Sequence, residues 1–425
     1  MTVVQPGAPG RGESEAGELL TGLSKRHRRG VVMRLLFQFS TVFGVIALIA
    51  LLYNIINESF GIVALKNEVE PETLAVSGVP LEGLPAETLA GILRERISKG
   101  VIRRFESEKP LAERSRTELY ELVLERVVNP QVAASWPLSE SLFRRARIRA
   151  EAQEKYPGAK LSFRSWIRPK FIVKSQSSDP QKTGVRAALL GSLWTIFITI
   201  IVAFPIGVGG AVYLEEYAKD TLLNRVIQTN IYNLAGVPSI IYGMLGLAIF
   251  VRALEPLTSG ALFGFVDPTT SNGRTVLSAG LTLALLVLPV IIINAQEAIR
   301  AVPRSLRHGG LALGATKWQT IWHHVIPVSI DRIMTATILA ISRAIGETAP
   351  LVVVGASTFV TVDPKGPFSK FTTLPMQIYQ WSARPQGAYR NAAAAAIVVL
   401  LALLITLNAS AVLLRNKFSK KKRLL

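Results

Sequence analysis

The chain has 425 residues, of which 49% are hydrophobic and 18% charged, and its formal net charge is +19. The mean hydropathy is +0.35 and the apolar residues gather in long blocks, which is typical of a membrane protein. Cysteine is absent, which excludes a disulfide framework, an iron–sulfur cluster and a thiol nucleophile.

Much of the positive charge lies beside apolar blocks, at residues 25–29 and 417–423, so it does not require a nucleic-acid partner. Short basic flanks mark the cytoplasmic side of a membrane, so we predict that both termini are cytoplasmic and that the number of spans is even. The apolar blocks predict six spans, at residues 35–53, 187–213, 226–251, 275–295, 333–359 and 391–414.

The first residues are predicted to be a disordered basic cytoplasmic tail, residues 1–30, because residues 1–24 are rich in Gly, Glu, Ser and Pro. Residues 31–55 are predicted to be the first transmembrane helix. A cleaved signal peptide is disfavoured, because about 30 residues precede the apolar block and no small-residue cleavage site follows it.

Residues 56–183 are predicted to form a periplasmic insert domain that is mostly helical. Residues 85–99 and 115–128 have helical apolar spacing, and Ser115 with Glu118 is typical of a capping box. The second half of the insert is basic, which a solvated face or contact with lipid head groups explains, although such a surface could also steer an anion or a partner protein. The sequence assigns no site to the insert.

Residues 184–415 hold the other five predicted spans, and residues 416–425 form a second basic cytoplasmic tail. The alternation of sides places the segment 296–327 in the cytoplasm, and its excess of Arg and Lys agrees. This segment has the pattern of two short amphipathic helices with a turn near Gly314. Helices that expose Leu, Trp and Ile in the cytoplasm need a partner surface to cover them.

The predicted span 333–359 is the only one that contains charge, with Arg343 and Glu347 near its middle. A charge at that depth costs roughly 2.5 to 3.5 kcal/mol, so it usually faces the protein interior or a solute path. An Arg guanidinium can grip an oxyanion with two hydrogen bonds. The alternative is a structural ion pair, since the two residues lie one helical turn apart; Glu347 is expected to hold Arg343 or to form a gate with a partner subunit.

Two predicted spans contain proline among glycines: Pro205 with Gly207, Gly209 and Gly210, and Pro238 with Gly236 and Gly243. Such breaks can expose backbone groups to a cavity, or they can only admit a neighbouring helix. We keep Ser239 as a candidate pathway residue.

Four further polar residues need no special chemistry. His323 and His324 diverge on a helix and have no accompanying carboxylate, so a membrane-interface position is expected and no metal site. Glu215 and Glu216 are expected to be a solvated helix end, with contact to an ATPase or a partner loop as the alternative.

The segment 308–327 resembles the coupling loop of ABC importer permeases, which has the pattern Glu-Ala-Ala, Gly and Ile-x-Leu-Pro. The register here runs from residue 308 through Gly314 to residues 326–327, with His-Gly-Gly in place of Glu-Ala-Ala and His324 at the Ile position. Other strings narrow the resemblance to the PstA family of phosphate permeases, over about residues 160–415. They lie at residues 191–194, 204–208, 213–218, 236–243, 343–350 and 374–379.

This resemblance implies an all-α polytopic protein with six transmembrane helices of the ABC importer permease type, in a bacterial inner membrane. It implies a heterodimer with a second phosphate permease subunit, a dimer of ATPase subunits and a periplasmic phosphate-binding protein. The chain has no Gly-x-x-x-x-Gly-Lys-Ser/Thr phosphate loop. ATP and Mg²⁺ are therefore expected on the partner ATPase, with no cofactor and no catalytic residue on this chain.

The expected function is that of a permease subunit for ATP-driven phosphate import. The alternatives are a permease for another oxyanion, such as molybdate or sulfate, and a membrane receptor that senses a ligand through the insert. The expected anion-pathway residues are Arg343, Glu347 and Ser239, and the expected ATPase-coupling residues are Arg307, Leu313, Gly314, Ala315, Lys317 and Trp318. Phosphate is expected to contact either this subunit or mainly its partner.

Overall fold

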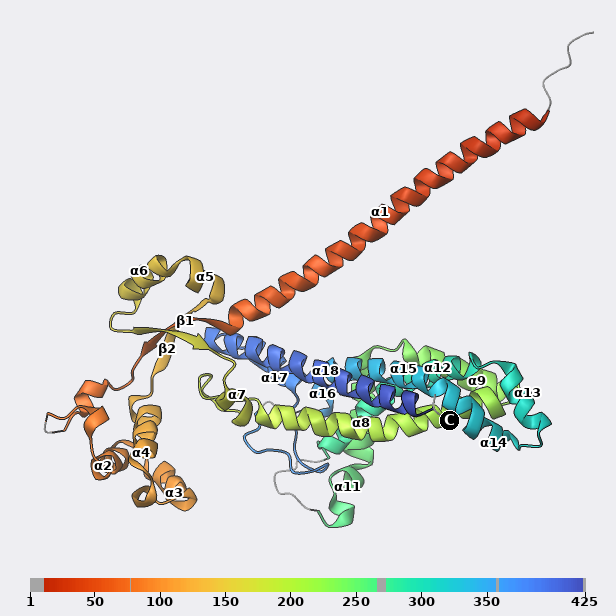
Figure 1. The fold of residues 1–425 in the computed structure, drawn as a ribbon. Helices are drawn as coiled ribbons and strands as arrows, with labels where there is room; N and C mark the ends of the chain where they lie inside the picture. Colours follow the sequence, from red (N-terminus) through yellow and green to blue (C-terminus); the bar gives the residue numbers. More distant parts are fainter. Residues whose placement is uncertain (1–10, 77, 266–272, 357–358, 423–425) are drawn as a thin grey trace, which may run out of the picture. The chain divides into compact units, whose positions relative to one another are not determined.

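The computed structural model describes residues 11–76, 78–265, 273–356 and 359–422 (Figure 1). The chain divides into two compact units, Met1–Ile55 and Ile56–Leu425. The first unit consists of most of helix α1 (Arg11–Ser59), and its segment His27–Ser59 is long and apolar enough to cross a membrane. The predicted disordered tail is wrong from Arg11 onward, since the helix begins there, and residues 1–10 lie outside the described part.

The first half of the insert is helical, as expected. Ser115 caps α4 by accepting a hydrogen bond from the Glu118 amide while the Glu118 carboxylate accepts one from the Ser115 amide, so the predicted capping box is confirmed. Buried leucines and valines join these elements into one small core. The elements are η1 (Pro71–Leu74), η2 (Leu81–Gly83), α2 (Ala86–Arg96), α3 (Lys99–Glu108), η3 (Leu111–Glu113), α4 (Arg116–Val123) and η4 (Leu124–Val128).

The insert also contains a three-stranded antiparallel sheet that the sequence pattern did not predict, with one strand at the start of the insert and two in its second half. Strand β1 (Phe60–Lys66) lies in the centre, between β2 (Gln131–Pro137) and β3 (Lys160–Ser165). Successive residues of β1 face opposite sides of the sheet. The elements around the sheet are α5 (Leu138–Phe143), α6 (Arg145–Lys155) and α7 (Pro169–Val173).

The two faces of β1 belong to different cores. Ala64 packs with Ile148 and Ala152 of α6, whereas Val63 packs in a core that includes Trp381 and Tyr389, which lie beyond the insert. The expected boundary at residues 183–184 therefore does not separate two compact units. The insert and the helical region share a core.

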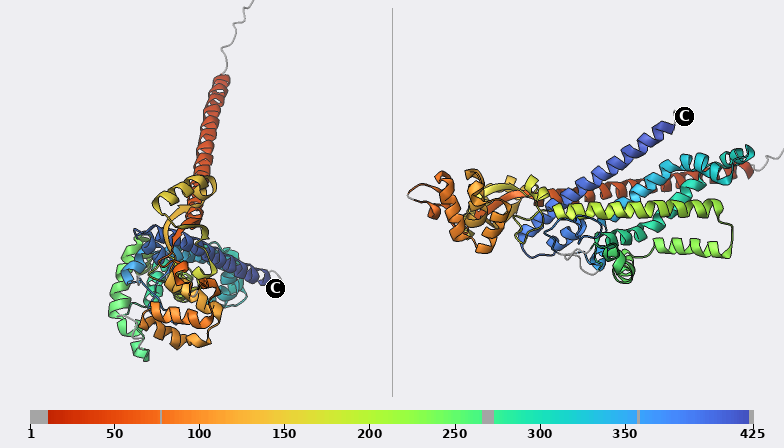
Figure 2. Two further views of the ribbon diagram at one scale, coloured as in Figure 1. Left: turned by 90° about the vertical axis from the view of Figure 1, so that its left-hand side faces the viewer. Right: turned by 90° about the horizontal axis from the view of Figure 1, so that it is seen from below.

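The helical region begins with α8, after a non-helical segment that follows α7 (Figure 1). After α8 the chain reverses direction into α9 (Figure 2, right). The elements are α8 (Arg186–Val212), η5 (Tyr213–Tyr217), α9 (Leu222–Ala235), α10 (Ser239–Gly246), η6 (Leu247–Ala253), α11 (Glu255–Thr258), η7 (Ala261–Phe263), α12 (Val276–Arg300), α13 (Arg304–Ala312), α14 (Lys317–Thr320), η8 (Ile321–Val325), α15 (Ile326–Gly346), α16 (Ala349–Val354), α17 (Leu374–Ser382) and α18 (Gly387–Lys422).

The described residues contain five helices that are long and apolar enough to cross a membrane, or six if one bent pair counts as a span. The bent pair joins Leu222–Ala235 to Ser239–Ala253 with an angle of 108°. The bend falls at residues 236–238, where a Gly and a Pro were expected to break the helix. The prediction of a mostly helical polytopic membrane protein is confirmed.

Small residues let the central helices approach closely. A Cβ atom on Gly207 of α8 would lie 2.6 Å from the Ile291 side chain of α12, and one on Gly243 of α10 would lie 2.6 Å from the Pro350 Cα atom of α16. Of the two roles expected for these glycines, packing against a neighbouring helix is the one that the structure shows. Ala340 and Ala344 similarly bring α15 against α8 and α12.

The predicted span 333–359 is not one helix. A continuous helical stretch runs from Lys317 to Gly346, and the chain then leaves helical geometry at Glu347, which has φ −73° and ψ 122°. Helix α16 begins two residues later with Pro350 in its first turn. Pro350 has no backbone N–H to donate to the Gly346 carbonyl four residues earlier, and its ring would clash with that carbonyl, which explains the break.

Candidate functional site

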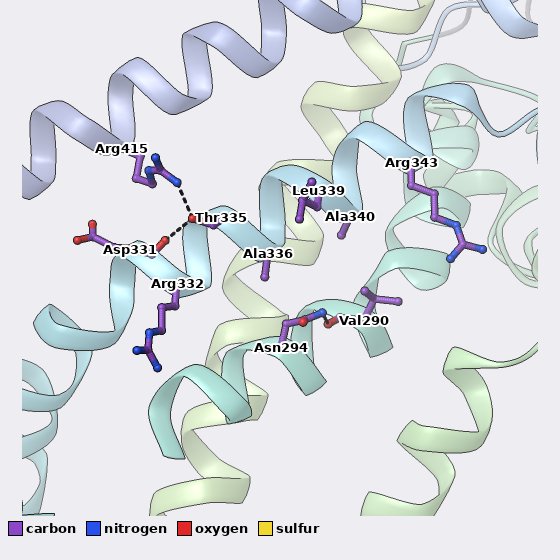
Figure 3. Close-up of a pocket in the computed structure, with 10 residues that line it drawn as sticks. All are labelled: Val290, Asn294, Asp331, Arg332, Thr335, Ala336, Leu339, Ala340, Arg343 and Arg415. Carbon is purple, nitrogen blue, oxygen red and sulfur yellow. Dashed lines mark hydrogen bonds between the residues drawn. The ribbon is translucent and has the colours of Figure 1, made fainter. Parts of the chain in front are cut away.

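A groove along α15 contains the predicted pathway arginine. It has a volume of about 570 Å³ and lies between α12, α15 and α18 (Figure 3). Its lining residues come from all three helices: Val290, Asn294, Asp331, Arg332, Thr335, Ala336, Leu339, Ala340, Arg343 and Arg415.

Arg343 and Glu347 are brought together as the sequence predicted. Arg343 lies in the last turn of α15 and Glu347 is the residue that caps this helix. The Nε atom of Arg343 lies 3.5 Å from Oε1 of Glu347, and the two side chains are 71% and 19% exposed. The half-buried carboxylate therefore holds the guanidinium of Arg343, which lies at the Val290 end of the groove (Figure 3).

The depth of Arg343 follows from its neighbour on α12. Val290 follows Val276 by 14 residues and precedes Arg300 by 10 residues on that helix. At 1.5 Å per residue, Val290 is roughly 21 Å from one end of α12 and 15 Å from the other. Arg343 thus lies near the middle of the bundle, although it is near the end of its own helix.

Ser239, the third expected pathway residue, is not at this groove. It begins α10, directly after the bend at Pro238, and it is not among the residues that line the groove. The groove instead includes Arg332, Asn294 and Arg415, which the sequence analysis did not select. Each of these three residues is polar and stands inside or beside an apolar run of the sequence, and this position could have indicated them as groove residues.

The segment 296–327 has the predicted turn near Gly314 after one short helix, α13, whereas the second predicted short helix is the start of the continuous helical stretch Lys317–Gly346. Gly314 lies in this turn with φ +80°, and Thr316 caps α14 through a capping box with Gln319. Leu313 is 89% exposed, and the exposed rings of Trp318 and Trp322 stack with centroids 5.4 Å apart. We call Leu313, Trp318 and Trp322 the tryptophan surface.

Two arginines of this segment, Arg300 and Arg307, form ion pairs with the glutamates of η5. The Nε atom of Arg307 donates to the Glu216 carboxylate at 2.8 Å, and its Nη atoms donate to the carbonyls of Val302 and Ile299 at 2.7 and 2.8 Å. The Arg300 guanidinium makes a similar two-bond contact with Glu215. The expected solvated helix end at these glutamates is wrong, since both carboxylates bind α12 or α13 of the same chain.

Two other expected coupling residues also serve the local structure. The Lys317 Nζ atom lies 5.1 Å from the centroid of the Tyr217 ring, in a cation–π contact. The half-buried Ala315 donates its amide to the Gly310 carbonyl and closes the turn. The tryptophan surface contributes three large exposed apolar side chains to the outward part of this segment.

Residues 203–423 match the family described as "Binding-protein-dependent transport system inner membrane component". The chain belongs to this family. It is thus a multi-pass inner-membrane permease subunit of a transport system, and the match begins within α8, covers the rest of the helical region and leaves out the insert.

Three curated relatives show which kind of permease this chain resembles. The permease is 32% identical over 248 residues to "Probable ABC transporter permease protein YqgI" of Bacillus subtilis, covering 56% of this chain and 78% of the relative. It is 32% identical to "Phosphate transport system permease protein PstA 1" of Mycobacterium tuberculosis, covering 57% and 72%. It is 31% identical to "Phosphate transport system permease protein PstC" of Pasteurella multocida, covering 49% and 67%. The expected resemblance to PstA permeases is confirmed.

Proposed function

We propose that this permease is a subunit of an ATP-driven phosphate importer and that phosphate passes along the groove at Arg343. The observation that carries the proposal is a largely exposed guanidinium near mid-depth of a membrane bundle, held by Glu347. The phosphate-transport relatives support phosphate as the anion.

The groove has the chemistry that an anion path needs. A guanidinium offers a fork of N–H donors that matches the oxygens of phosphate. The nearby Glu347 carboxylate repels an anion and so limits how tightly Arg343 holds it. Moderate binding suits transport, because an ion that binds too strongly does not leave.

The other parts of the importer have matching surfaces on this chain. The tryptophan surface supplies apolar area for an ATPase subunit dimer, which binds ATP and Mg²⁺. Arg307 anchors α13 to the end of α8, and the continuous helix Lys317–Gly346 connects the same segment to Arg343. The open groove faces a second permease subunit, and the insert lies on the periplasmic side, where a phosphate-binding protein delivers its ligand. Both termini are then cytoplasmic.

Replacement of Arg343 tests the pathway directly. The complete complex with Arg343→Gln, Arg343→Lys or Lys417→Gln is reconstituted in lipid vesicles, and labelled phosphate uptake is measured. Loss of a charged hydrogen bond predicts a fall of roughly tenfold or more for Arg343→Gln, partial activity for Arg343→Lys, and normal uptake for Lys417→Gln, a basic residue outside the groove.

The assembly of each variant complex is checked by size-exclusion chromatography. Wild-type uptake by an assembled Arg343→Gln complex would contradict the proposal that phosphate passes along the groove at Arg343. Unlabelled phosphate, sulfate and molybdate are then added in competition. Phosphate is expected to compete best; stronger competition by sulfate or molybdate would assign the importer to that oxyanion instead.

A receptor that senses through the insert has a different signature. It would signal without ATP-dependent accumulation of a solute in vesicles. We expect accumulation to require ATP and the binding protein together, and a complex that binds its partners yet accumulates no solute would favour the receptor.

A further inference from the structure

A second arginine lies on the same face of α15 as Arg343. Arg332 precedes Arg343 by 11 residues, and both line the groove. Eleven residues at about 100° each return to within roughly 20° of the same direction, with a rise of about 16 Å. The two guanidiniums therefore lie along one stripe, and Arg332 is the nearer to α13 and α14.

Arg332 is available to a ligand. It is exposed, and within the described residues its side chain makes no hydrogen bond and no ion pair. Its sequence neighbour Asp331 points to another side of the helix (Figure 3). The third groove arginine, Arg415, is by contrast engaged, since its Nη1 atom donates to Thr335 at 2.7 Å.

The stripe between the two arginines is mostly apolar. Ala336 and Leu339 lie between them on α15, and Val290 and Asn294 face the groove from α12. The Asn294 amide is tethered, since its Nδ2 atom donates to the Val290 carbonyl at 2.7 Å. An anion that leaves Arg343 toward α13 therefore crosses an apolar stretch before it reaches the level of Arg332 and of Arg415, whose guanidinium is bonded to Thr335.

We propose that Arg332 is a second binding residue for the transported oxyanion, at the end of the groove nearer α13, where it receives the anion from Arg343 before release. Two moderate sites separated by a barrier let an ion enter and leave, whereas a single strong site traps it. This proposal rests on the proposed function of the groove.

The absence of cysteine from the chain allows a charge-rescue test. Arg332→Cys is introduced into the complete complex in lipid vesicles, and the thiol is modified with a cationic or an anionic methanethiosulfonate. We expect Arg332→Cys to lower maximal phosphate uptake roughly tenfold, with little change in the binding-protein concentration that gives half-maximal uptake. The cationic reagent should restore uptake and the anionic reagent should not.

A binding readout accompanies the transport assay. Inorganic phosphate at the face nearer α13 should slow modification of Cys at position 332, and chloride at equal ionic strength should not. The unsubstituted complex, treated with the same reagents, gives the background from partner subunits. Lys417→Cys is the matched control, and neither reagent should alter its uptake.

Three outcomes overturn the proposal: wild-type uptake by unmodified Arg332→Cys, equal rescue by both reagents, or no protection by phosphate. The second outcome would assign Arg332 a structural role. Failure of the proposed function is distinguishable, because it would appear as normal uptake in Arg343→Gln whatever Arg332 does.

Discussion

The Nη2 atom of Arg307 lies 2.7 Å from Oε1 of Glu216, and the two side chains are only 20% and 9% exposed. This ion pair joins α13 to η5, the continuation of α8, at the segment that resembles a coupling loop. The pair therefore ties α13 directly to the end of α8, in addition to the connection through the chain.

Glu216→Ala should destabilise the protein. It leaves the Arg307 guanidinium without its carboxylate in a half-buried place, and loss of a charged hydrogen bond costs about 1.5 to 3 kcal/mol. Glu215→Ala is the matched control, because its partner Arg300 is largely exposed and the pair should contribute about 1 kcal/mol or less. Thermal unfolding in detergent should therefore show the larger fall in Tm for Glu216→Ala; equal falls would contradict this view of the pair.

Gly314→Val should weaken binding of the ATPase subunits. The glycine has φ +80°, with no other group within 4 Å of the Cβ position, so the cost is backbone strain of about 1 to 2 kcal/mol. Gly314→Asn should retain more binding, because asparagine tolerates this conformation. Copurification of the ATPase measures the effect, and Gly309→Ala, in the adjacent helix with open space around it, should be neutral. Full binding by the valine variant would show that the turn is dispensable.

Gly243→Ala should disturb the packing of α10 on α16. The added methyl group would lie 2.6 Å from the Pro350 Cα atom, and overpacking costs about 1 to 3 kcal/mol. Gly209→Ala, whose Cβ position meets no group within 4 Å, is the control. A lower Tm is expected for Gly243→Ala alone. An unchanged Tm for both variants would contradict the close packing of α10 on α16.

The cap of α4 should respond to acid. The Lys109 ammonium and the Ser115 amide hold the pKa of the Glu118 carboxyl below its usual value of 4.5. Because the folded pKa is the lower one, the stabilisation is present above about pH 4.5 and is lost as the pH falls through the folded pKa. Protection of the α4 amides from hydrogen exchange should decrease over this range.

Two variants distinguish the contribution of the Glu118 carboxylate to this cap from that of the Ser115 hydroxyl. Glu118→Gln keeps a side-chain acceptor and removes the titrating group, so the acid dependence should vanish. Ser115→Ala should lower protection of α4 at every pH, by about 1 kcal/mol. An acid response that survives in Glu118→Gln would assign it to another group.

The sequence predicted the features that depend on local pattern. Apolar run length located the spans, the Ser115–Glu118 spacing located a helix start, and the cost of buried charge selected Arg343. Each of these rules acts within a few residues of the chain, so no knowledge of packing was needed.

The features that depend on packing were missed. Strand β1 follows the first span directly and has the same apolar residues, so nothing in its pattern separates it from the end of a helix. Glu215 and Glu216 look like a solvated helix end until Arg300 and Arg307 are placed beside them by the fold. Arg332 joins the groove only because α12 and α18 pack beside its face of α15.

The core that β1 shares with the helical region has a practical consequence for protein engineering. Trp381 is completely buried, and its ring contacts Phe171 of the insert as well as Tyr389. A shortened protein that joins residue 59 directly to residue 184 would lack Phe171 and would uncover the Trp381 and Tyr389 rings at this end of the bundle. The insert is part of the core of the helical region. A minimal version of this permease therefore has to retain the sheet, even though the family match begins only at residue 203.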